Sequence, residues 1–167
     1  MNIPTHIEHW RMIDGYLNYE ISSHGRVRNI NTSKILKQHY NKDYCQIKLC
    51  NNGIRKNFRV HRLVAAAYCD NDNNYPEVDH IDQNKKNNLY TNLRWANRSI
   101  NERNTGIRKD NTSGVKGVFY HKRDKIWYVY MVAEEGSKRK SKNFKTKEEA
   151  IEYRKTMEEQ NGYTAQK

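Results

Sequence analysis

The first sixty residues alternate between apolar and polar positions in short runs that turns interrupt. YLNYEISSHGRVRNI and YCQIKLCNNGIRKNFRV both show this pattern. A period of two residues is typical of strands that bury one face. Asn52-Gly53 separates two such runs, and this pair favours a tight hairpin because both residues tolerate positive φ. We therefore expect a small strand-rich module over residues 10–60.

Helical spacing begins at residue 60. An apolar stripe runs along VHRLVAAAY, at Leu63, Val64 and Ala67. A polar loop with the segment QNKKNN follows, and it has no periodicity. From about Arg94 onward, NLRWANRSINERN predicts a second helix. One side of this helix carries asparagines at i, i+4 and i+7: Asn97, Asn101 and Asn104.

The last third of the chain predicts three strands and then a helix. Residues 105–113 are polar and lack periodicity, so we expect a linker there. GVFYHKR, IWYVYMV and KRKSKNF have the aromatic, β-branched or alternating pattern of strands, and EEGSK turns the chain between the last two. TKEEAIEYRKTMEEQNG predicts a helix with a capping box from Thr146 to Glu149 and a terminal glycine, Gly162. One face of this sheet is expected to stay uncovered.

The composition points to a polyanionic partner. The 167 residues include 31 Lys+Arg and 19 Asp+Glu, a formal charge of +12. The excess is shared, with 16 basic against 10 acidic residues up to position 104 and 15 against 9 after it. Both parts are therefore expected to lie against nucleic acid, although a basic protein that is merely soluble has the same composition. The low hydrophobic fraction, 35%, favours two small modules over a compact metabolic enzyme.

Cysteine usage and apolar segments bear on the compartment. Cys45, Cys50 and Cys69 are odd in number and include no Cys-x-x-Cys pair, so neither a disulfide framework nor a zinc knuckle is indicated. The beginning, MNIPTHIEHW, lacks the apolar stretch of a signal peptide, and no segment approaches the length that spans a membrane. We expect an intracellular protein, in the cytoplasm of a host cell or the nucleus of a eukaryotic host, with no membrane partner.

The stretch VDHIDQNKKNN, residues 78–88, carries candidate chemistry. Asn101 on the following helix can approach Asp79, and a carboxylate paired with an amide oxygen suits Mg²⁺ or Mn²⁺. His80 would then stay neutral and off the metal as a general base, with Asn92 orienting its ring. The residues alone leave other readings open. His80 can equally be a solvated residue of a polar loop, and Asn92 can be a helix N-cap.

Three segments in order resemble parts of HNH homing endonucleases of the phage and viral type. In the middle of the chain the matching elements are the helix HRLVA, the pair DH followed by D-x-N-K-x-N-N, the segment NLRW, and the asparagine-bearing helix after it. Upstream, YLNYEISSHGRVRNI resembles the small module that often precedes this nuclease. Downstream, SGVKGVFYHKRDKIWYVYM and KNFKTKEEAIEYRK are similar to the plant apetala-type DNA-binding domain. The resemblance covers residues 10 to about 157.

The resemblance implies an α+β fold in three parts. Residues 1–104 would hold a strand-rich module and a ββα-metal nuclease core, residues 105–113 a linker, and residues 114–167 a three-stranded sheet packed on one helix. The implied activity is that of a site-specific DNA endonuclease, a phosphodiester hydrolase that nicks double-stranded DNA as a monomer. A DNA-binding regulator with an inactive nuclease site is the alternative. An RNA-binding module is disfavoured because no RNP-type aromatic signature is present.

The roles known for the family are assigned to the residues of this chain that match its motif. The resemblance implies that His80 is the general base, that Asn92 orients it, and that Asp79 and Asn101 bind one divalent cation, Mg²⁺ or Mn²⁺. Asn101 stands where many relatives have a final histidine. Gln83 stands where relatives usually have glycine, so the turn there is expected to differ. Asp82 is interpreted as closing the loop. The complete set of Asp79, His80, Asn92 and Asn101 argues against the inactive alternative.

The C-terminal sheet offers a candidate DNA-reading face. Period two places Trp127 and Val129 on one face of a strand, which the helix should cover, and Tyr128 and Tyr130 on the other. We expect DNA contacts from the open face, at Lys116, His121, Arg123, Tyr128, Tyr130, Lys138, Lys140 and Lys142. Arg26 and Arg28 of the first module are expected to hold phosphates. Without the resemblance, an ordinary solvated face remains the alternative.

Overall fold

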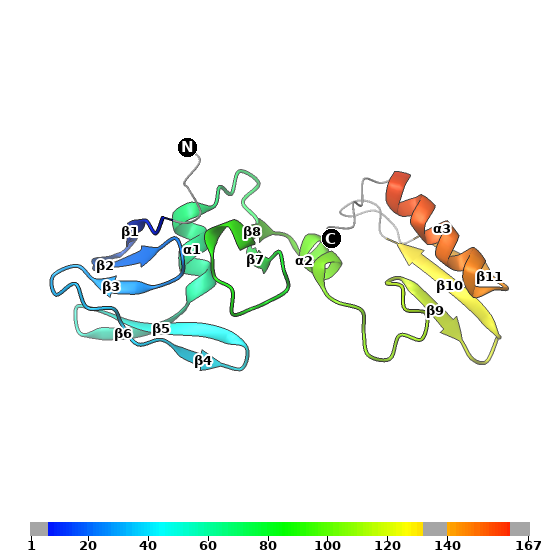
Figure 1. Ribbon diagram of the computed structural model, residues 1–167, viewed down its shortest axis with the longest axis horizontal. Helices are drawn as coiled ribbons and strands as arrows, with labels where there is room; N and C mark the ends of the chain where they lie inside the picture. The colour runs from blue at the N-terminus through cyan, green and yellow to red at the C-terminus, as the bar shows by residue number, and fades with distance from the viewer. Residues whose placement is uncertain (1–6, 132–139, 161–167) are drawn as a thin grey trace. The chain divides into compact units, whose positions relative to one another are not determined.

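The computed structural model describes residues 7–131 and 140–160, and the chain divides into two compact units, residues 1–105 and 106–167 (Figure 1). The segment 105–113, expected to be a linker, contributes to the second unit. Asn111 donates from Nδ2 to the carbonyl oxygen of Val118 at 3.2 Å, and Ser113 is buried. The polar residues there form a structured turn because their side chains bond to nearby backbone groups.

Two three-stranded antiparallel meanders begin the first unit. One contains β1 (Trp10–Ile13), β2 (Tyr16–Ser22) and β3 (Val27–Asn29); the other contains β4 (His39–Asn41), β5 (Tyr44–Asn51) and β6 (Ile54–Arg59). The hairpin predicted at Asn52-Gly53 is confirmed, because both residues of the turn have positive φ, 49° and 78°. That geometry matches the twist of the flanking strands.

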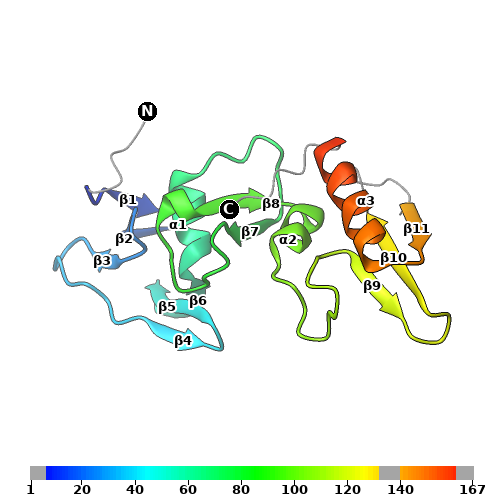
Figure 2. The same cartoon turned by 45° about the vertical axis from the view of Figure 1, so that its right-hand side comes forward.

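A helix and a small α/β element complete the first unit. Helix α1 (Val60–Tyr68) contacts strands of both meanders and of the ribbon formed by β7 (Glu77–His80) and β8 (Leu93–Ala96) (Figure 2). A short 3₁₀ turn, η1 (Tyr90–Asn92), precedes β8, and α2 (Arg98–Asn104) follows it. The core comes from alternate positions of β2 and β5 and from one side of α1, with Ile21, Ile47, Leu49, Val60 and Val64 fully buried. Its position places β7 against α1.

The helix expected from about Arg94 begins later, and this boundary was predicted wrongly. Residues 93–96 form β8, which pairs antiparallel with β7 so that Leu93 lies opposite His80 and Ala96 opposite Glu77. Both Leu93 and Ala96 are buried, so pairing with β7 and burial outweigh the local helical spacing. The helix starts only after Asn97, whose side-chain oxygen accepts a hydrogen bond from the backbone of Ile100 at 2.8 Å and caps α2.

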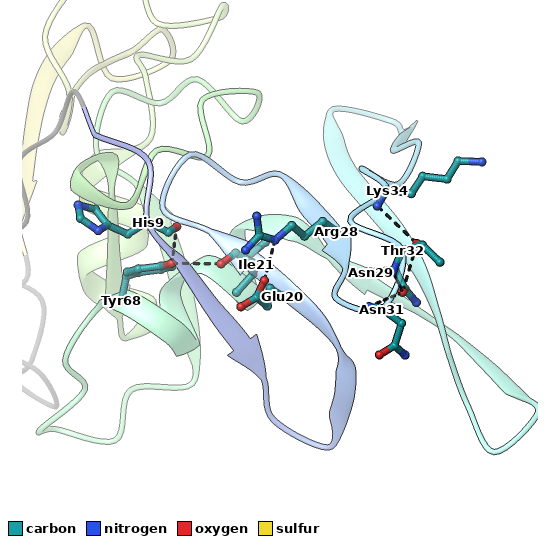
Figure 3. A network of polar contacts seen from close by, with 9 residues as sticks. All are labelled: His9, Glu20, Ile21, Arg28, Asn29, Asn31, Thr32, Lys34 and Tyr68. Atoms are coloured by element: carbon teal, nitrogen blue, oxygen red, sulfur yellow. Dashed lines mark hydrogen bonds and ion pairs between the residues drawn. The ribbon is translucent and has the colours of Figure 1, made fainter.

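Polar contacts join the first meander to α1. The Tyr68 hydroxyl, at the end of α1, lies 2.7 Å from the carbonyl oxygen of His9 and 3.1 Å from that of Ile21 (Figure 3). Burial raises the pKa of Tyr68 to about 12, against the opposing influence of Arg11. The hydroxyl therefore stays protonated and donates to the meander, which fixes α1 to β2.

The second unit is a three-stranded antiparallel sheet with one helix. Strands β9 (Val118–His121), β10 (Ile126–Met131) and β11 (Lys140–Phe144) lie in the order β11-β10-β9, and α3 (Lys147–Gln160) packs on the face that carries Val118 and Val129. The capping box is confirmed, with reciprocal bonds between Thr146 and Glu149. Gly162 lies outside the described residues. The mixed α and β architecture expected from the sequence is confirmed.

Candidate nuclease centre

Strand β7 carries Asp79 and His80 on opposite faces, and both side chains are buried, at 6% and 5% exposed. The backbone of β7 pairs with β8, so its two faces meet different partners. Asp79 faces β8 and α2, whereas His80 faces α1 and the loop that follows β7. A buried carboxylate and a buried imidazole on one short strand are unusual and need polar partners.

Asp79 has a partner on each oxygen. The guanidinium of Arg94, on β8, lies 2.9 Å from Oδ2. Asn104, on the last turn of α2, donates from Nδ2 to Oδ1 at 3.0 Å and to the carbonyl oxygen of His80 at 2.6 Å. Arg94 and Asn104 together hold the carboxylate in one orientation.

Asn101 reaches the neighbouring acid rather than Asp79. Its Nδ2 donates to Oε2 of Glu77 at 2.5 Å. Glu77 and Asp79 share one face of β7, and Asn101 and Asn104 lie one turn apart on α2, so the two strand acids face the two helix amides in register. The structure therefore brings Asn101 to this face of β7, with Asn104 as the direct partner of Asp79.

His80 is oriented by a residue that sequence reasoning did not single out. Its Nε2 lies 3.2 Å from Oδ1 of Asn88, which is itself buried. Asn88 belongs to the asparagine-rich run that was interpreted as loop. It ends the motif D-x-N-K-x-N-N, but no role was assigned to it, because only the folded loop brings it back to β7.

Asn92, expected to orient His80, instead organises the loop between β7 and η1. Its Nδ2 donates to Asp82 at 2.8 Å and to the carbonyl oxygen of Asn87 at 2.9 Å, and its Oδ1 accepts from the backbone of Asp82 at 3.0 Å. Desolvation raises the pKa of Asp82, but hydrogen bonds from Asn87, Asn92 and the backbone of Asn84 together outweigh it and lower that pKa. Asp82 closes the loop through these bonds, and Asn92 holds the segment that leads to Asn88.

A second histidine, His61 on α1, lies against His80 and was not singled out from the sequence. The ring centroids are 5.0 Å apart, and Tyr44 of β5 lies 5.0 Å from His61 on another side. Burial, followed by the influence of His80, Arg59 and Arg62, lowers the pKa of His61 to about 3. His61 is therefore neutral at ordinary pH and adds no charge beside His80.

The outer face of the second meander is basic, and sequence reasoning did not single it out. Alternate residues of β5 turn inward, while the outward positions of the three strands pair across the sheet. This basic sheet face consists of His39, Asn41, Tyr44, Gln46, Lys48, Cys50, Arg55, Asn57 and Arg59. None of these is acidic. The signal was available, because Arg55, Asn57 and Arg59 occupy every second position of IRKNFR.

Arg26 and Arg28, expected to hold phosphates, are each paired with an acid. Nε of Arg28 lies 2.6 Å from Oε2 of Glu20 (Figure 3), and Arg26 pairs with Glu8. Both guanidinium groups also lie over the ring of Trp10, that of Arg28 at 4.3 Å. Their charges are thus largely compensated within the module.

In the second unit, the expected DNA-reading face is aromatic rather than basic. Tyr130 stacks on Phe119 with centroids 5.3 Å apart, and His121 meets Tyr128 edge-on. The register pairs Lys142 with Val129, and its Nζ lies 4.8 Å from the ring centroid of Tyr153 on α3. Lys142 therefore belongs to the helix side, and its expected place beside the tyrosines is wrong. Lys140 pairs with Met131 in the strand register, and its side chain lies outside the described residues.

The remaining residues of that expectation have mixed positions. Ser141 and Asn143 are the β11 residues opposite Tyr130 and Tyr128, so the third strand adds polar groups without charge to the tyrosine face. Arg123 is exposed and lies 3.1 Å from Asp124, which also faces His121 at 2.9 Å. Lys116 precedes β9 and is half-buried. Lys138 lies outside the described residues.

Comparison with known proteins identifies the parts of the chain. Residues 8–50 match the NUMOD4 motif, residues 58–103 match HNH endonuclease, and residues 118–165 match an uncharacterised protein family conserved in bacteria, DUF2188. The solved structure described as DNA binding and cleavage by the HNH homing endonuclease I-HmuI is similar, with a TM-score of 0.55 and 33% identity over 87% of this chain and 82% of that chain.

The chain belongs to the HNH endonucleases. Among related HNH endonucleases, the DNA endonuclease I-HmuI of Bacillus phage SP01 is 45% identical over 97 residues, which cover 57% of this chain and 56% of that enzyme. An uncharacterised HNH endonuclease of Acanthamoeba polyphaga mimivirus is 40% identical over 113 residues, 68% of this chain and 33% of that protein. The chain thus spans about half or less of the length of these relatives. The apetala-type resemblance is not shown, and residues 118–165 match DUF2188 instead.

Two further findings bound this HNH endonuclease. Over residues 7–131 and 140–160, no group of three or more His, Cys, Asp or Glu side chains lies where it could hold a metal ion. Within the same ranges, no helix is both long and apolar enough to cross a membrane.

Proposed function

We propose that this chain is a metal-dependent endonuclease that hydrolyses phosphodiester bonds at specific sites in double-stranded DNA. The observation that carries the proposal is the pair on β7: a buried carboxylate facing the amides of α2, next to a buried imidazole with a fixed partner. Membership of the HNH endonucleases and the likeness to I-HmuI support the same activity.

His80 is the general base in this proposal. A base must keep one imidazole nitrogen free to take a proton from the attacking water. Asn88 engages Nε2, so Nδ1 is the nitrogen left for that water. His61 is neutral and lies beside the ring, so it shields His80 from solvent without adding charge. The products would carry 5′-phosphate and 3′-hydroxyl ends.

HNH nucleases generally use a divalent metal ion, and the donors here fit one. Asp79 offers a carboxylate and α2 offers amide oxygens, which are hard ligands suited to Mg²⁺ or Mn²⁺. When bound, such an ion stabilises the charge that develops on the phosphate and the leaving oxygen. We propose Asp79 and Asn101 as its ligands. The two hydrogen bonds from Nδ2 of Asn104 suit a residue that orients Asp79 from outside the coordination shell.

The basic sheet face supports DNA as the substrate. Lys48, Arg55 and Arg59 are exposed on it without an acid among their neighbours in the sheet. Arg59 also lies over the ring of Tyr44, which contacts His61, so the face continues toward His80. A charged three-stranded sheet can lie along a DNA groove and place one DNA strand near His80, the proposed general base. The face with Tyr128 and Tyr130 in the second unit is proposed as a further DNA contact.

One His80 per chain implies one strand cut per binding event. We therefore propose that a monomer nicks its target, and that a double-strand break requires two chains or two visits. The viral and phage origin of the relatives supports action on DNA inside a host cell.

The test is metal-dependent nicking of supercoiled DNA. A pool of plasmids with random inserts is incubated with the protein and Mg²⁺ or Mn²⁺, and nicks are mapped by sequencing. We expect nicked circles at a few positions, and their loss on addition of a chelator. The His80→Ala variant should bind the same DNA and leave it intact. Recovery of no metal-dependent nick with either ion would refute the endonuclease assignment, and normal cutting by His80→Ala would refute the choice of base.

A further inference from the structure

Asn88 is the one described side chain whose polar atom contacts the His80 ring within hydrogen-bond distance. The contact is buried, with Asn88 8% exposed, and it joins Oδ1 to Nε2 at 3.2 Å. An amide oxygen only accepts, so this contact requires the proton on Nε2 and leaves the lone pair on Nδ1. Asn88 therefore selects the tautomer and the orientation of the ring.

Two hydrogen bonds from η1 hold the backbone on either side of Asn88 in place. Asn92 donates to the carbonyl oxygen of Asn87 at 2.9 Å, so the backbone immediately before Asn88 cannot swing away from β7. Immediately after it, Tyr90 donates its backbone N–H to the carbonyl oxygen of Ser23 at 2.9 Å. The second bond reaches into the N-terminal meander.

The turn after β2 lies directly behind Asn88. Gly25 has a φ of 85°, and a Cβ built on it would lie 2.8 Å from Cβ of Asn88 and 3.4 Å from its carbonyl oxygen. Ser22 and Ser23 in the same turn are fully buried, and Ser22 closes the turn by accepting hydrogen bonds from Gly25 and Arg26. The backbone of the turn thus packs directly against Asn88, and a residue with a side chain at position 25 would clash with it.

We propose that Asn88 is a positioning residue for His80, and that the Ser22–Gly25 turn of the NUMOD4 segment holds it there. The NUMOD4 segment is then a structural part of the nuclease centre, in addition to any contact it makes with DNA. This inference rests on the proposed function of His80 as the base. It assigns to Asn88 the direct contact that the resemblance assigns to Asn92, which supports Asn88 through the loop.

A first experiment reads the tautomer without any cleavage. Long-range ¹H–¹⁵N spectra of the full chain, recorded above neutral pH, report which imidazole nitrogen of His80 carries the proton. Wild type should show the Nε2–H form, and Asn88→Ala should show a mixture. Asn88→Asp, whose carboxylate can only accept, should retain the Nε2–H form. An Nδ1–H ring in wild type, or an unchanged Nε2–H ring in Asn88→Ala, would overturn the inference even if the chain cut no DNA.

A second experiment measures kcat and KM for nicking of a DNA target that the plasmid assay has identified. Asn88→Ala should lower kcat about 10- to 100-fold, the usual effect of removing such an outer partner, with little change in KM. Asn88→Asp should restore most of the loss. An inactive wild type would defeat the endonuclease proposal alone, because the spectra still decide the role of Asn88. An active wild type together with a fully active Asn88→Ala would defeat the positioning role alone.

A matched pair of glycine variants isolates the turn. Gly25 and Gly53 both have positive φ, 85° and 78°, but nothing lies within 4 Å of a Cβ placed on Gly53. Gly25→Ala and Gly53→Ala therefore carry similar backbone strain, and only the first displaces Asn88. At temperatures where melting curves show both folded, Gly25→Ala should lose kcat and the Nε2–H tautomer while Gly53→Ala keeps them. Equal kcat and equal spectra for the two variants would show that the turn does not hold Asn88.

Discussion

Asn104 donates a hydrogen bond to the carboxylate of Asp79, at 3.0 Å from Nδ2 to Oδ1, while Asn101 one turn earlier reaches Glu77. The same Asn104 nitrogen bonds the carbonyl oxygen of His80, so it ties together the backbone and the side chain of β7. Two helix amides therefore compete for the role of metal ligand, and their bonds suggest different functions for them.

Alanine variants of the two asparagines separate these functions. Asn101→Ala should raise the Mg²⁺ concentration needed for half-maximal nicking by tenfold or more, since a ligand is lost. Asn104→Ala should leave that concentration within a few-fold and lower kcat, since Asp79 loses only its orientation. Titration of the nicking rate with Mg²⁺ measures both quantities. The reverse order of effects would transfer the ligand role to Asn104.

The basic sheet face should account for more of the salt dependence of DNA binding than the paired arginines. Lys48→Ala or Arg55→Ala removes an exposed cation, so the slope of log K against log salt should fall by about 0.9 for each phosphate that the variant no longer neutralises. Arg28→Ala is the matched control, because Glu20 already compensates its charge. Binding isotherms at several salt concentrations give the slopes. A larger change for Arg28→Ala than for Lys48→Ala would restore the phosphate role first expected for Arg28.

The strands and helices were largely predictable because they depend on local patterns. The hairpin at Asn52-Gly53 and the capping box at Thr146 were confirmed because each needs only neighbouring residues. The boundary between β8 and α2 was missed because burial and pairing with β7 outweigh local spacing there. Tertiary context overrides propensity in this way wherever a short segment has both patterns.

The candidate site was predictable only for residues that their chemical type singles out, and not for those that reach the site through the fold. Asp79 and His80 stand out as residue types, and the structure places both in buried positions on β7. Asn88 and His61 reach His80 through a folded loop and a separate helix, and no spacing in the chain encodes those contacts. The error at Lys142 is one of register. Period two gives the parity within a strand, but the register between β10 and β11 decides which parity meets the tyrosines.

Gln83, where the resemblance leads one to expect glycine, has a left-handed backbone with φ of 63°. A residue with a side chain is strained in this region by about 1–2 kcal/mol. Glycine removes this strain, but its greater conformational entropy in the unfolded chain offsets part of the gain. Gln83→Gly should therefore stabilise the first unit by about 0.5 kcal/mol. Asp72→Gly, at an exposed loop position without positive φ, should instead be neutral or destabilising. Urea unfolding, followed by NMR signals of the first unit, makes the comparison, and a loss of stability in Gln83→Gly would contradict it.

His61 should make the first unit lose stability as the pH falls from about 6.5 toward 3. Its pKa in the folded protein is about 3, whereas an unfolded histidine titrates near 6.5. Between these values the unfolded chain binds one more proton than the folded chain, so acid favours unfolding. The slope of the unfolding free energy from this one group is about 1.4 kcal/mol per pH unit, and it vanishes above about pH 6.5.

His61→Phe removes the titrating group and keeps an aromatic ring in the buried site. The free energy of unfolding of the first unit, measured in urea between pH 7.5 and 4.5, should then fall less steeply with acid than that of wild type. Carboxylates and the other histidines are common to both proteins, so the difference between the two slopes reports His61. His39→Phe is the control, because His39 is exposed and its replacement should leave the slope unchanged. Parallel curves for wild type and His61→Phe would mean that folding does not lower the pKa of His61, and His80 would then have a cation beside it below about pH 6.5.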